Sequence, residues 1–267
     1  ADANNTGFGS QQVFFNDYLL VSAPYGPANG ENQDDGGLVH VCLYNGLTVD
    51  CLETLKAPRT DGESAAHNRF GFSIASGSNF VAIGALGDAS AANAQNAIHI
   101  FRDRNHEYQN GEATSRFEHV QTINDLSTSV ENSRFGASIA ALRDQLLVGV
   151  KVIDAEGNLE GQVWSFRQQA QPGGNSPFLI REREYTLVAP EVEREAGSAA
   201  TFGDSIAVSP TGNLLLVGHP GGGNGQGQVS GQTLLFMPDA TSGFWVPQAI
   251  LTPAEEGDSD GFGASVA

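Results

Sequence analysis

The segment Asp260-Gly261-Phe262-Gly263-Ala264-Ser265-Val266-Ala267 occurs again, in recognisable form, earlier in the chain. The phenylalanines of the five copies stand at positions 8, 70, 135, 202 and 262, at intervals of 62, 65, 67 and 60 residues. A regular period of this length is typical of proteins built from structural repeats. The chain is therefore predicted to be an array of units, each beginning at a Phe-Gly pair. The other copies are Gly7-Phe8-Gly9-Ser10, Arg69-Phe70-Gly71-Phe72-Ser73-Ile74-Ala75, Arg134-Phe135-Gly136-Ala137-Ser138-Ile139-Ala140 and Thr201-Phe202-Gly203-Asp204-Ser205-Ile206-Ala207.

Each unit contains four short apolar segments that are rich in β-branched and aromatic residues and bounded by Gly, Pro, Asn or Asp. This pattern predicts four β-strands per unit. The second segment is almost continuously apolar, as expected for a strand covered on both faces. The fourth is the most polar, and Pro247 in the last complete unit indicates a sheet edge, because proline cannot donate to a strand ladder. In the first unit the four segments are 9–15, 18–24, 37–43 and 51–55.

Four-stranded antiparallel units repeated radially form a β-propeller, in which each blade buries its faces against its neighbours. We therefore predict an all-β fold, with residues 1–267 forming a single β-propeller or part of one. The rungs of a β-solenoid are shorter than these units, which argues against that alternative. The predicted blades are 7–60, 69–126, 134–190 and 201–253, followed by the start of a fifth blade at 261–267.

The unit resembles the Phe-Gly/Gly-Ala-Pro repeat of integrin α-subunit propellers and of related bacterial and protist surface proteins. The resemblance implies a seven-bladed propeller, of which this chain supplies four blades and the first strand of a fifth. Two alternatives are that four blades close alone, or that the terminal strand pairs with another molecule. The first half of the repeat is Phe8-Gly9, Phe70-Gly71, Phe135-Gly136, Phe202-Gly203 and Phe262-Gly263, and the second half is Ser22-Ala23-Pro24, Gly84-Ala85-Leu86, Gly149-Val150-Lys151 and Gly218-His219-Pro220.

The two cysteines, Cys42 and Cys51, lie on either side of Asn45-Gly46. A hairpin at this point would allow them to form a disulfide, and two buried free thiols are the alternative. Their place and spacing are similar to those of a disulfide in the first blade of integrin α-subunits, which implies an extracellular or cell-surface protein. Asn4, in Asn4-Asn5-Thr6, is a candidate glycosylation site.

The integrin-type family carries Asp-rich calcium loops between the first and second strands of several blades, because calcium needs several oxygen ligands within one turn. Here each of these connections holds at most one carboxylate. No metal site and no cofactor is therefore predicted, and calcium stays an open alternative without the family's loops to hold it. The six histidines also lack metal-ligand spacing within any one segment.

The formal net charge is −18, from 31 acidic and 13 basic residues. Such a surface repels phosphate backbones, so we expect no nucleic-acid partner. No apolar run is long enough to predict a membrane span. The chain also contains no Gly-x-Ser-x-Gly elbow and no phosphate loop with its lysine, so no catalytic residue is predicted and we expect a protein that is not an enzyme.

The predicted function is that of a non-catalytic, integrin-α-like extracellular propeller for adhesion, or for recognition of a protein or glycan partner through loops on one face. The alternative is a structural subunit of a surface layer or filament that self-associates through its C-terminal strand, because an inner strand left without a neighbour exposes unpaired backbone groups. The candidate recognition loops are Tyr25–Gly36, Gly87–Asn96, Val152–Glu160 and Gly221–Gly227.

Overall fold

The fold was analysed in a computed structural model of the chain. The residues that the structure describes are 6–27, 36–58, 68–87, 96–104, 116–125, 133–155, 157–169, 179–189, 201–222, 230–254 and 261–267.

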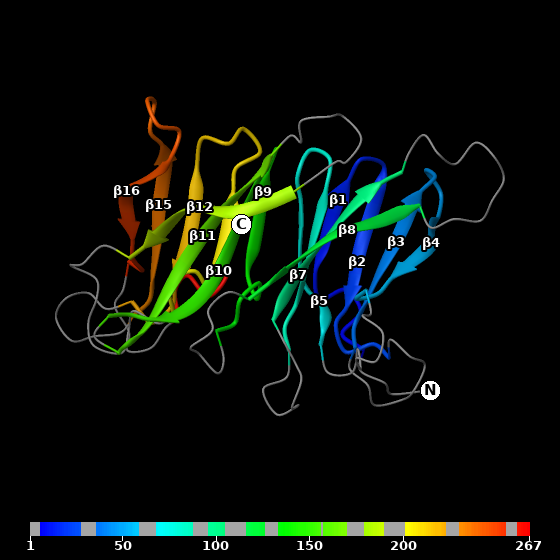
Figure 1. Ribbon diagram of the computed structural model, residues 1–267, viewed down its shortest axis with the longest axis horizontal. Coiled ribbons are helices and arrows are strands. Elements are labelled where there is room, and N and C mark those ends of the chain that lie inside the picture. The colour runs from blue at the N-terminus through cyan, green and yellow to red at the C-terminus, as the bar shows by residue number, and fades with distance from the viewer. Residues whose placement is uncertain are drawn as a thin grey trace. The chain divides into compact units, whose positions relative to one another are not determined.

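The described residues form sixteen β-strands, and these are arranged in four sheets of four strands (Figure 1). The first sheet contains β1 (Gln12–Phe15), β2 (Tyr18–Ala23), β3 (Leu38–Tyr44) and β4 (Val49–Leu55). The second contains β5 (Phe70–Ser76), β6 (Val81–Ala85), β7 (Ala97–Asp103) and β8 (Phe117–Asn124). The third contains β9 (Ile139–Leu142), β10 (Gln145–Ile153), β11 (Leu159–Gln169) and β12 (Leu179–Val188). The fourth contains β13 (Ser205–Val208), β14 (Leu215–His219), β15 (Gln232–Pro238) and β16 (Trp245–Leu251).

In every sheet the strands are hydrogen-bonded in chain order. The neighbouring strands that are paired residue by residue among the described residues run antiparallel. Each sheet is therefore an up-and-down meander, which is the topology of a propeller blade. The predicted fold class, an all-β propeller of four-stranded antiparallel blades, is confirmed, with four blades in this chain. The seven-bladed total and the blade boundaries stay predictions.

Burial changes across each blade in the predicted direction. The second strand is its most buried part: all five residues of β6 are buried, and β2 exposes none of its residues. The fourth strand is the most open, since five of the seven residues of β16 are exposed. Apolar side chains in the second strands are therefore covered on both faces, as their nearly continuous apolar sequence predicts.

A β-bulge lies between the third and fourth strands of three blades, at the same position of the repeat. In the fourth blade the shift in register follows Leu235, and Phe236 then pairs with Pro247. β16 is the outer strand of its sheet. A bulge on an edge strand is a position where proline costs no ladder hydrogen bond, which confirms the edge predicted from Pro247.

The sequence places the start of the first strand too early in three of the four blades. β1, β9 and β13 begin after the Phe-Gly pair, whereas the second blade's β5 includes it. The glycine of the pair takes a positive φ, of 88° at Gly9, 78° at Gly136 and 87° at Gly203. This left-handed conformation interrupts regular strand pairing. In these three blades the Phe-Gly pair is therefore a turn that precedes the inner strand, whereas in the second blade Gly71, with φ 89°, lies at a bulge within β5.

The chain divides into two compact units, one containing the first two blades and the other most of the last two. Each unit has its own apolar cluster, which includes Phe70 and Leu20 in the first and Phe202 and Leu215 in the second. Three of the five repeat phenylalanines anchor their blades in the core, since Phe70, Phe135 and Phe202 are at most 1% exposed, whereas Phe8 and Phe262 are exposed.

Neighbouring blades within a unit meet through backbone, at glycines. A Cβ added at Gly37 would lie 2.2 Å from the carbonyl oxygen of Phe70, and one added at Gly161 would lie 2.2 Å from that of Phe202. A Cβ added at Gly231 would lie 2.4 Å from the carbonyl oxygen of Phe262. Gly231 and Phe262 also form a parallel β-bridge. The Phe-Gly turn of one blade therefore sits directly on the third strand of the blade before it.

We predict that Gly161→Ala lowers the free energy of unfolding by about 1–3 kcal/mol or more, because a methyl group has no room against the Phe202 backbone. Gly161 does not have a positive φ, so the cost is steric. Chemical denaturation measures the change. The control is Gly243→Asn, since Gly243 has φ 71° and open space around its Cβ position and Asn tolerates that conformation. Equal stability of the Gly161→Ala and control variants would contradict the proposed packing.

Candidate functional site

A small pocket lies where the third and fourth blades meet, and both blades contribute side chains to it. It is lined by Arg134, Ala137, Ser138, Gly149, Val150, Lys151, Phe202, Gly203 and Asp204, and most of its space is open to solvent. Backbone hydrogen bonds fix its walls: Gly149 N donates to Ser138 O at 2.9 Å, and Gly203 N donates to Gly218 O at 2.9 Å. Rigid strand ends therefore hold the polar groups of the pocket in place.

The pocket contains an ion pair of opposite charges from the two blades. Lys151 Nζ, on β10, lies 3.5 Å from Asp204 Oδ1, one residue before β13. The side chains are only 15% and 24% exposed, respectively. Partial burial lowers the local dielectric and strengthens interactions with a bound polar group. Arg134 adds a second cation to the lining and is itself exposed.

These charges are not part of the repeat. At the position of Lys151 the other blades have Pro24, Leu86 and Pro220, and at the position of Asp204 the other copies have Ser10, Phe72, Ala137 and Ala264. The remaining copies thus fold with no charge at either place. Lys151 and Asp204 are therefore additions to a blade contact that does not need them for folding, which makes this pocket the best candidate site among the described residues.

The pocket groups have complementary chemistry. A carboxylate that solvent can reach can accept a proton from water, and an ammonium beside it can donate a hydrogen bond to a carbonyl oxygen. The hydroxyl of Ser138 adds a donor and acceptor to the same lining. This site is not predicted from the sequence because its residues come from different repeats. The signal that could have revealed it is the departure of Lys151 and Asp204 from the repeat pattern.

A second polar group joins the same two blades but is buried. Gln145 Nε2 donates to Ser165 Oγ and to Tyr185 OH, both at 2.9 Å, and Trp245 Nε1 donates to Gln145 Oε1 at 3.1 Å. Ser165 is fully buried and Gln145 is 6% exposed. Burial raises the pKa of the Tyr185 hydroxyl, which therefore stays protonated at neutral pH. Because Trp245 belongs to the fourth blade and Gln145 to the third, the network ties the two blades together.

The third candidate is a histidine pair in the second blade. His99 Nδ1 and His119 Nε2 both bond Thr122 Oγ1, at 3.0 and 3.1 Å. Burial, with a smaller contribution from His119, lowers the pKa of His99 to about 3. Both rings pack against Phe101 or Phe70. These hydrogen bonds and ring contacts give the pair a structural role in its blade. The described residues contain no cluster of three or more potential metal-ligating side chains.

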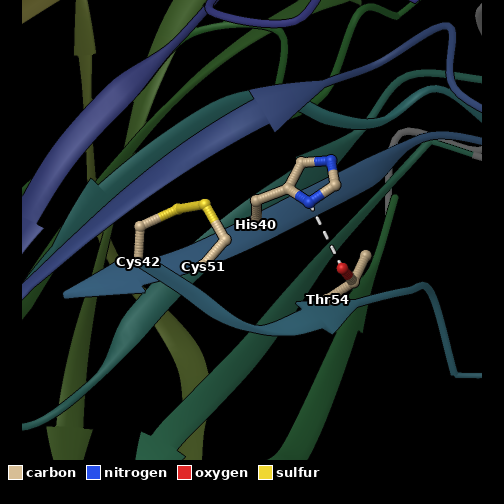
Figure 2. The surroundings of a disulfide bond; sticks show 4 residues. All are labelled: His40, Cys42, Cys51 and Thr54. Atoms are coloured by element: carbon tan, nitrogen blue, oxygen red, sulfur yellow. Dashed lines mark hydrogen bonds between the residues drawn. A yellow bond between two sulfur atoms is a disulfide. The ribbon is translucent and has the colours of Figure 1, made fainter. Parts of the chain in front are cut away.

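The cysteines Cys42 and Cys51 form a disulfide between β3 and β4 (Figure 2). They face each other in the strand register, and on the same strands His40 Nδ1 bonds Thr54 Oγ1 at 3.2 Å. The prediction of a bridge over free thiols is confirmed. Disulfides persist in oxidising compartments, which agrees with a protein that works outside a reducing cytosol.

Other predicted sites fall partly or wholly outside the described residues. Asn4 does so, as do most of three of the four candidate recognition loops. The fourth loop contains Asp154, whose Oδ1 accepts a hydrogen bond from Asn158 N at 2.7 Å. The Asp154 carboxylate therefore stabilises the turn between Asp154 and Asn158. None of the described residues belongs to a helix with the length and apolar character needed to cross a bilayer.

Comparisons with known proteins find similarity only at the level of structure. No family model matches the sequence, and no curated protein matches it. A solved structure described as a proposed 6-phosphogluconolactonase from Bacteroides fragilis matches with 12% identity and a TM-score of 0.43, over 91% of this chain and 56% of that one. The periplasmic gluconolactonase of Pseudomonas aeruginosa matches with 12% identity and a TM-score of 0.40, over 92% of this chain and 72% of that one. This chain thus spans little more than half the length of the first.

These comparisons contradict two predictions made from the sequence. The matched structures carry the names of enzymes, whereas we expected a non-catalytic adhesion or recognition propeller, or alternatively a structural subunit of a layer or filament. We also expected no enzyme. The physical reason for the error is that a propeller can assemble a site from loops of different blades, so the absence of a local catalytic motif does not exclude catalysis.

The histidine pair predicts a loss of stability in acid. Below the ordinary histidine pKa of 6.5 the unfolded chain binds a proton at residue 99, whereas the folded chain does so only near pH 3. The free energy of unfolding therefore decreases as pH falls through this range, and at pH ~5 the decrease is about 2 kcal/mol.

His99→Asn should remove this part of the pH dependence in urea unfolding, although it lowers stability at neutral pH. The control is His40→Asn, at the equivalent position of the first blade, where the ring is less buried. An unchanged pH slope in His99→Asn would show that His99 does not stay neutral in the folded protein.

The Gln145 network gives a separate prediction. Gln145→Leu should lower the free energy of unfolding by about 1–3 kcal/mol, because Trp245 Nε1 loses its buried acceptor. Thermal unfolding measures the change against Gln12→Leu, a substitution at an exposed glutamine of β1. Equal stability of the two variants would show that the hydrogen bonds of Gln145 do not stabilise the fold.

Proposed function

We propose that this chain is an ester hydrolase of the lactonase type and that its site is the pocket between β10 and the turn before β13. The observation that carries the proposal is the Lys151–Asp204 pair, which is partly buried in an open pocket and absent from the other copies of the repeat. The matched structures are too distant to support a substrate. Their names serve only to choose the first compounds to test.

The groups of the pocket suit hydrolysis of an ester carbonyl. Asp204 accepts a proton from a water molecule as the water oxygen attacks the carbonyl carbon. Lys151 donates a hydrogen bond to the carbonyl oxygen as negative charge develops on it. The ring C–O bond then breaks, and the leaving alkoxide takes the proton from Asp204. Lactone and water become a hydroxy acid, and both side chains return to their starting state.

The environment of the pair strengthens these roles. Lys151 is one of two lysines in a chain of net charge −18, so its ammonium stands out in an otherwise acidic protein. Its side chain is 15% exposed, which lowers the dielectric around a developing oxyanion. Asp204 is more open, at 24%, which leaves its carboxylate within reach of water.

The size of the pocket limits the substrate. The enclosed part of the pocket has room for about one water molecule, and the rest of its space is open to solvent. The proposed substrate is therefore an ester that places only its reacting carbonyl group against the pocket, while the rest of the molecule stays in solvent.

The repeat itself supports a further part of the proposal. We place the blades in the Phe-Gly/Gly-Ala-Pro repeat group on the five Phe-Gly copies and their contacts with the preceding blade, without carrying over the adhesive function of integrins. The Cys42–Cys51 disulfide supports an extracellular location.

The activity test uses glucono-δ-lactone and a panel of small lactones, with acid release followed in a pH-stat after subtraction of the uncatalysed rate. The purified chain should hydrolyse at least one of them. Asp204→Asn should lower kcat by about 100-fold or more, and Lys151→Gln by a similar factor. Lys56→Gln, which removes the other lysine, is the matched control and should retain full activity.

Two outcomes would reject the proposal. The first is no turnover of any lactone in the panel by the folded wild-type chain. The second is unchanged kcat in Asp204→Asn, provided that circular dichroism shows the variant to be folded.

A further inference from the structure

Arg134 and Arg143 form no ion pair with any described carboxylate, and only Arg134 of the two lines the pocket. Arg102 and Arg104 pair with Glu118, Arg116 lies beside Asp103, and Arg167 pairs with Asp144 and Glu184. No carboxylate among the described residues forms an ion pair with Arg134, although it lines the pocket. In a protein with 31 acidic residues, an arginine that faces a pocket without such a partner is available to an external anion.

The backbone at Arg134 is fixed, so its side chain starts from a defined point. Lys151 N donates to Ser133 O at 2.6 Å, and Ala137 N donates to Arg134 O at 2.9 Å. Arg134 has φ 51°, in the left-handed region. The same repeat position is glycine at Gly7 and Gly261, which adopt this conformation without a Cβ penalty. An arginine here costs backbone energy that glycine would avoid.

Arg69 provides an internal comparison, because it occupies the same position in the second blade with φ 45°. Its guanidinium lies 6.0 Å from the centre of the Tyr25 ring, a cation–π arrangement within the protein. The repeat thus tolerates arginine at this position, and in the second blade the protein itself supplies a partner for the charge. In the third blade the side chain lies at the pocket.

The charges that line the pocket sum to +1, from Arg134, Lys151 and Asp204. Within a chain of net charge −18 this is a local reversal of sign. A guanidinium binds carboxylate and phosphate groups through two parallel hydrogen bonds, and such charge-assisted bonds are about twice as strong as neutral ones. A neutral ligand would leave the positive charge uncompensated.

We infer that the pocket binds small organic anions, with Arg134 as the residue that holds the carboxylate or phosphate group. Combined with the proposed function, on which this extension rests, the substrate is a small ester that carries a negative charge. The anionic group lies at Arg134, and the reacting carbonyl lies at the Lys151–Asp204 pair. The binding of an anion does not itself depend on catalysis, so the two can be tested apart.

The binding experiment is a calorimetric titration of the whole chain with inorganic phosphate, gluconate and, as a neutral comparison, glucose. At least one of the two anions should bind, glucose should not, and binding should weaken as sodium chloride is raised. The relative affinities for phosphate and gluconate identify which anionic group the site prefers. Arg134→Asn should weaken anion binding by about 10-fold or more.

Arg69→Asn is the matched control, because both variants remove an arginine from the same left-handed repeat position and Asn tolerates that backbone. It should leave anion affinity unchanged. Equal loss in both variants would overturn the inference, since it would indicate a general effect of charge. Absence of binding by either anion would also overturn it.

The inference and the proposed function fail in different ways. Arg134-dependent anion binding without lactone turnover would reject the hydrolase and support the binding site. Turnover of a neutral lactone that neither phosphate nor gluconate inhibits, with unchanged KM in Arg134→Asn, would support the hydrolase and reject the anion site. A raised KM for an anionic lactone in Arg134→Asn, with kcat retained, would support both.

Discussion

The packing of neighbouring blades depends on one backbone contact, in which the Phe-Gly turn of a blade lies on a glycine of the blade before it. Among the described residues it occurs at Gly37 with Phe70, at Gly161 with Phe202 and at Gly231 with Phe262. The rings of Phe70 and Phe202 lie in the cores of their own blades, so these two turns each connect two blades, whereas the ring of Phe262 is partly exposed. Side chains larger than hydrogen are excluded at the glycine, because protein interiors are close-packed.

That contact also determines where function can arise. The turn and the glycine are needed for packing, whereas the residues beside them are free to vary between copies. At the contact of the third and fourth blades these positions hold Lys151 and Asp204, with Arg134 at the edge of the same pocket. Because both walls of the pocket are strand ends tied by backbone hydrogen bonds, the charged groups are held without a dedicated loop. A repeated scaffold thus carries a unique site.

The sequence and the structure agree best where the repeat is strongest. All four strands of each blade, the edge position of Pro247 and the Cys42–Cys51 bridge follow from patterns in the chain, because strand alternation and hairpin spacing are local properties. The inner strands start later than expected, since a positive φ at the glycine of the turn is not visible in an apolar pattern. The expectation of a non-catalytic protein was wrong because it depended on local motifs, which a site shared between blades does not require.

The sequence by itself determined the repeat, its phase, the all-β blade and the unusual acidity of the chain, because period, strand pattern and charge are properties of the residues in order. Only the tertiary structure decided which of the residues that depart from the repeat lie close together. Lys151 and Asp204 belong to different blades, and the distance of 3.5 Å between Lys151 Nζ and Asp204 Oδ1 follows from the packing of the Phe202-Gly203 turn beside β10. A contact between residues distant in the chain depends on how the blades pack, and no local pattern encodes that distance.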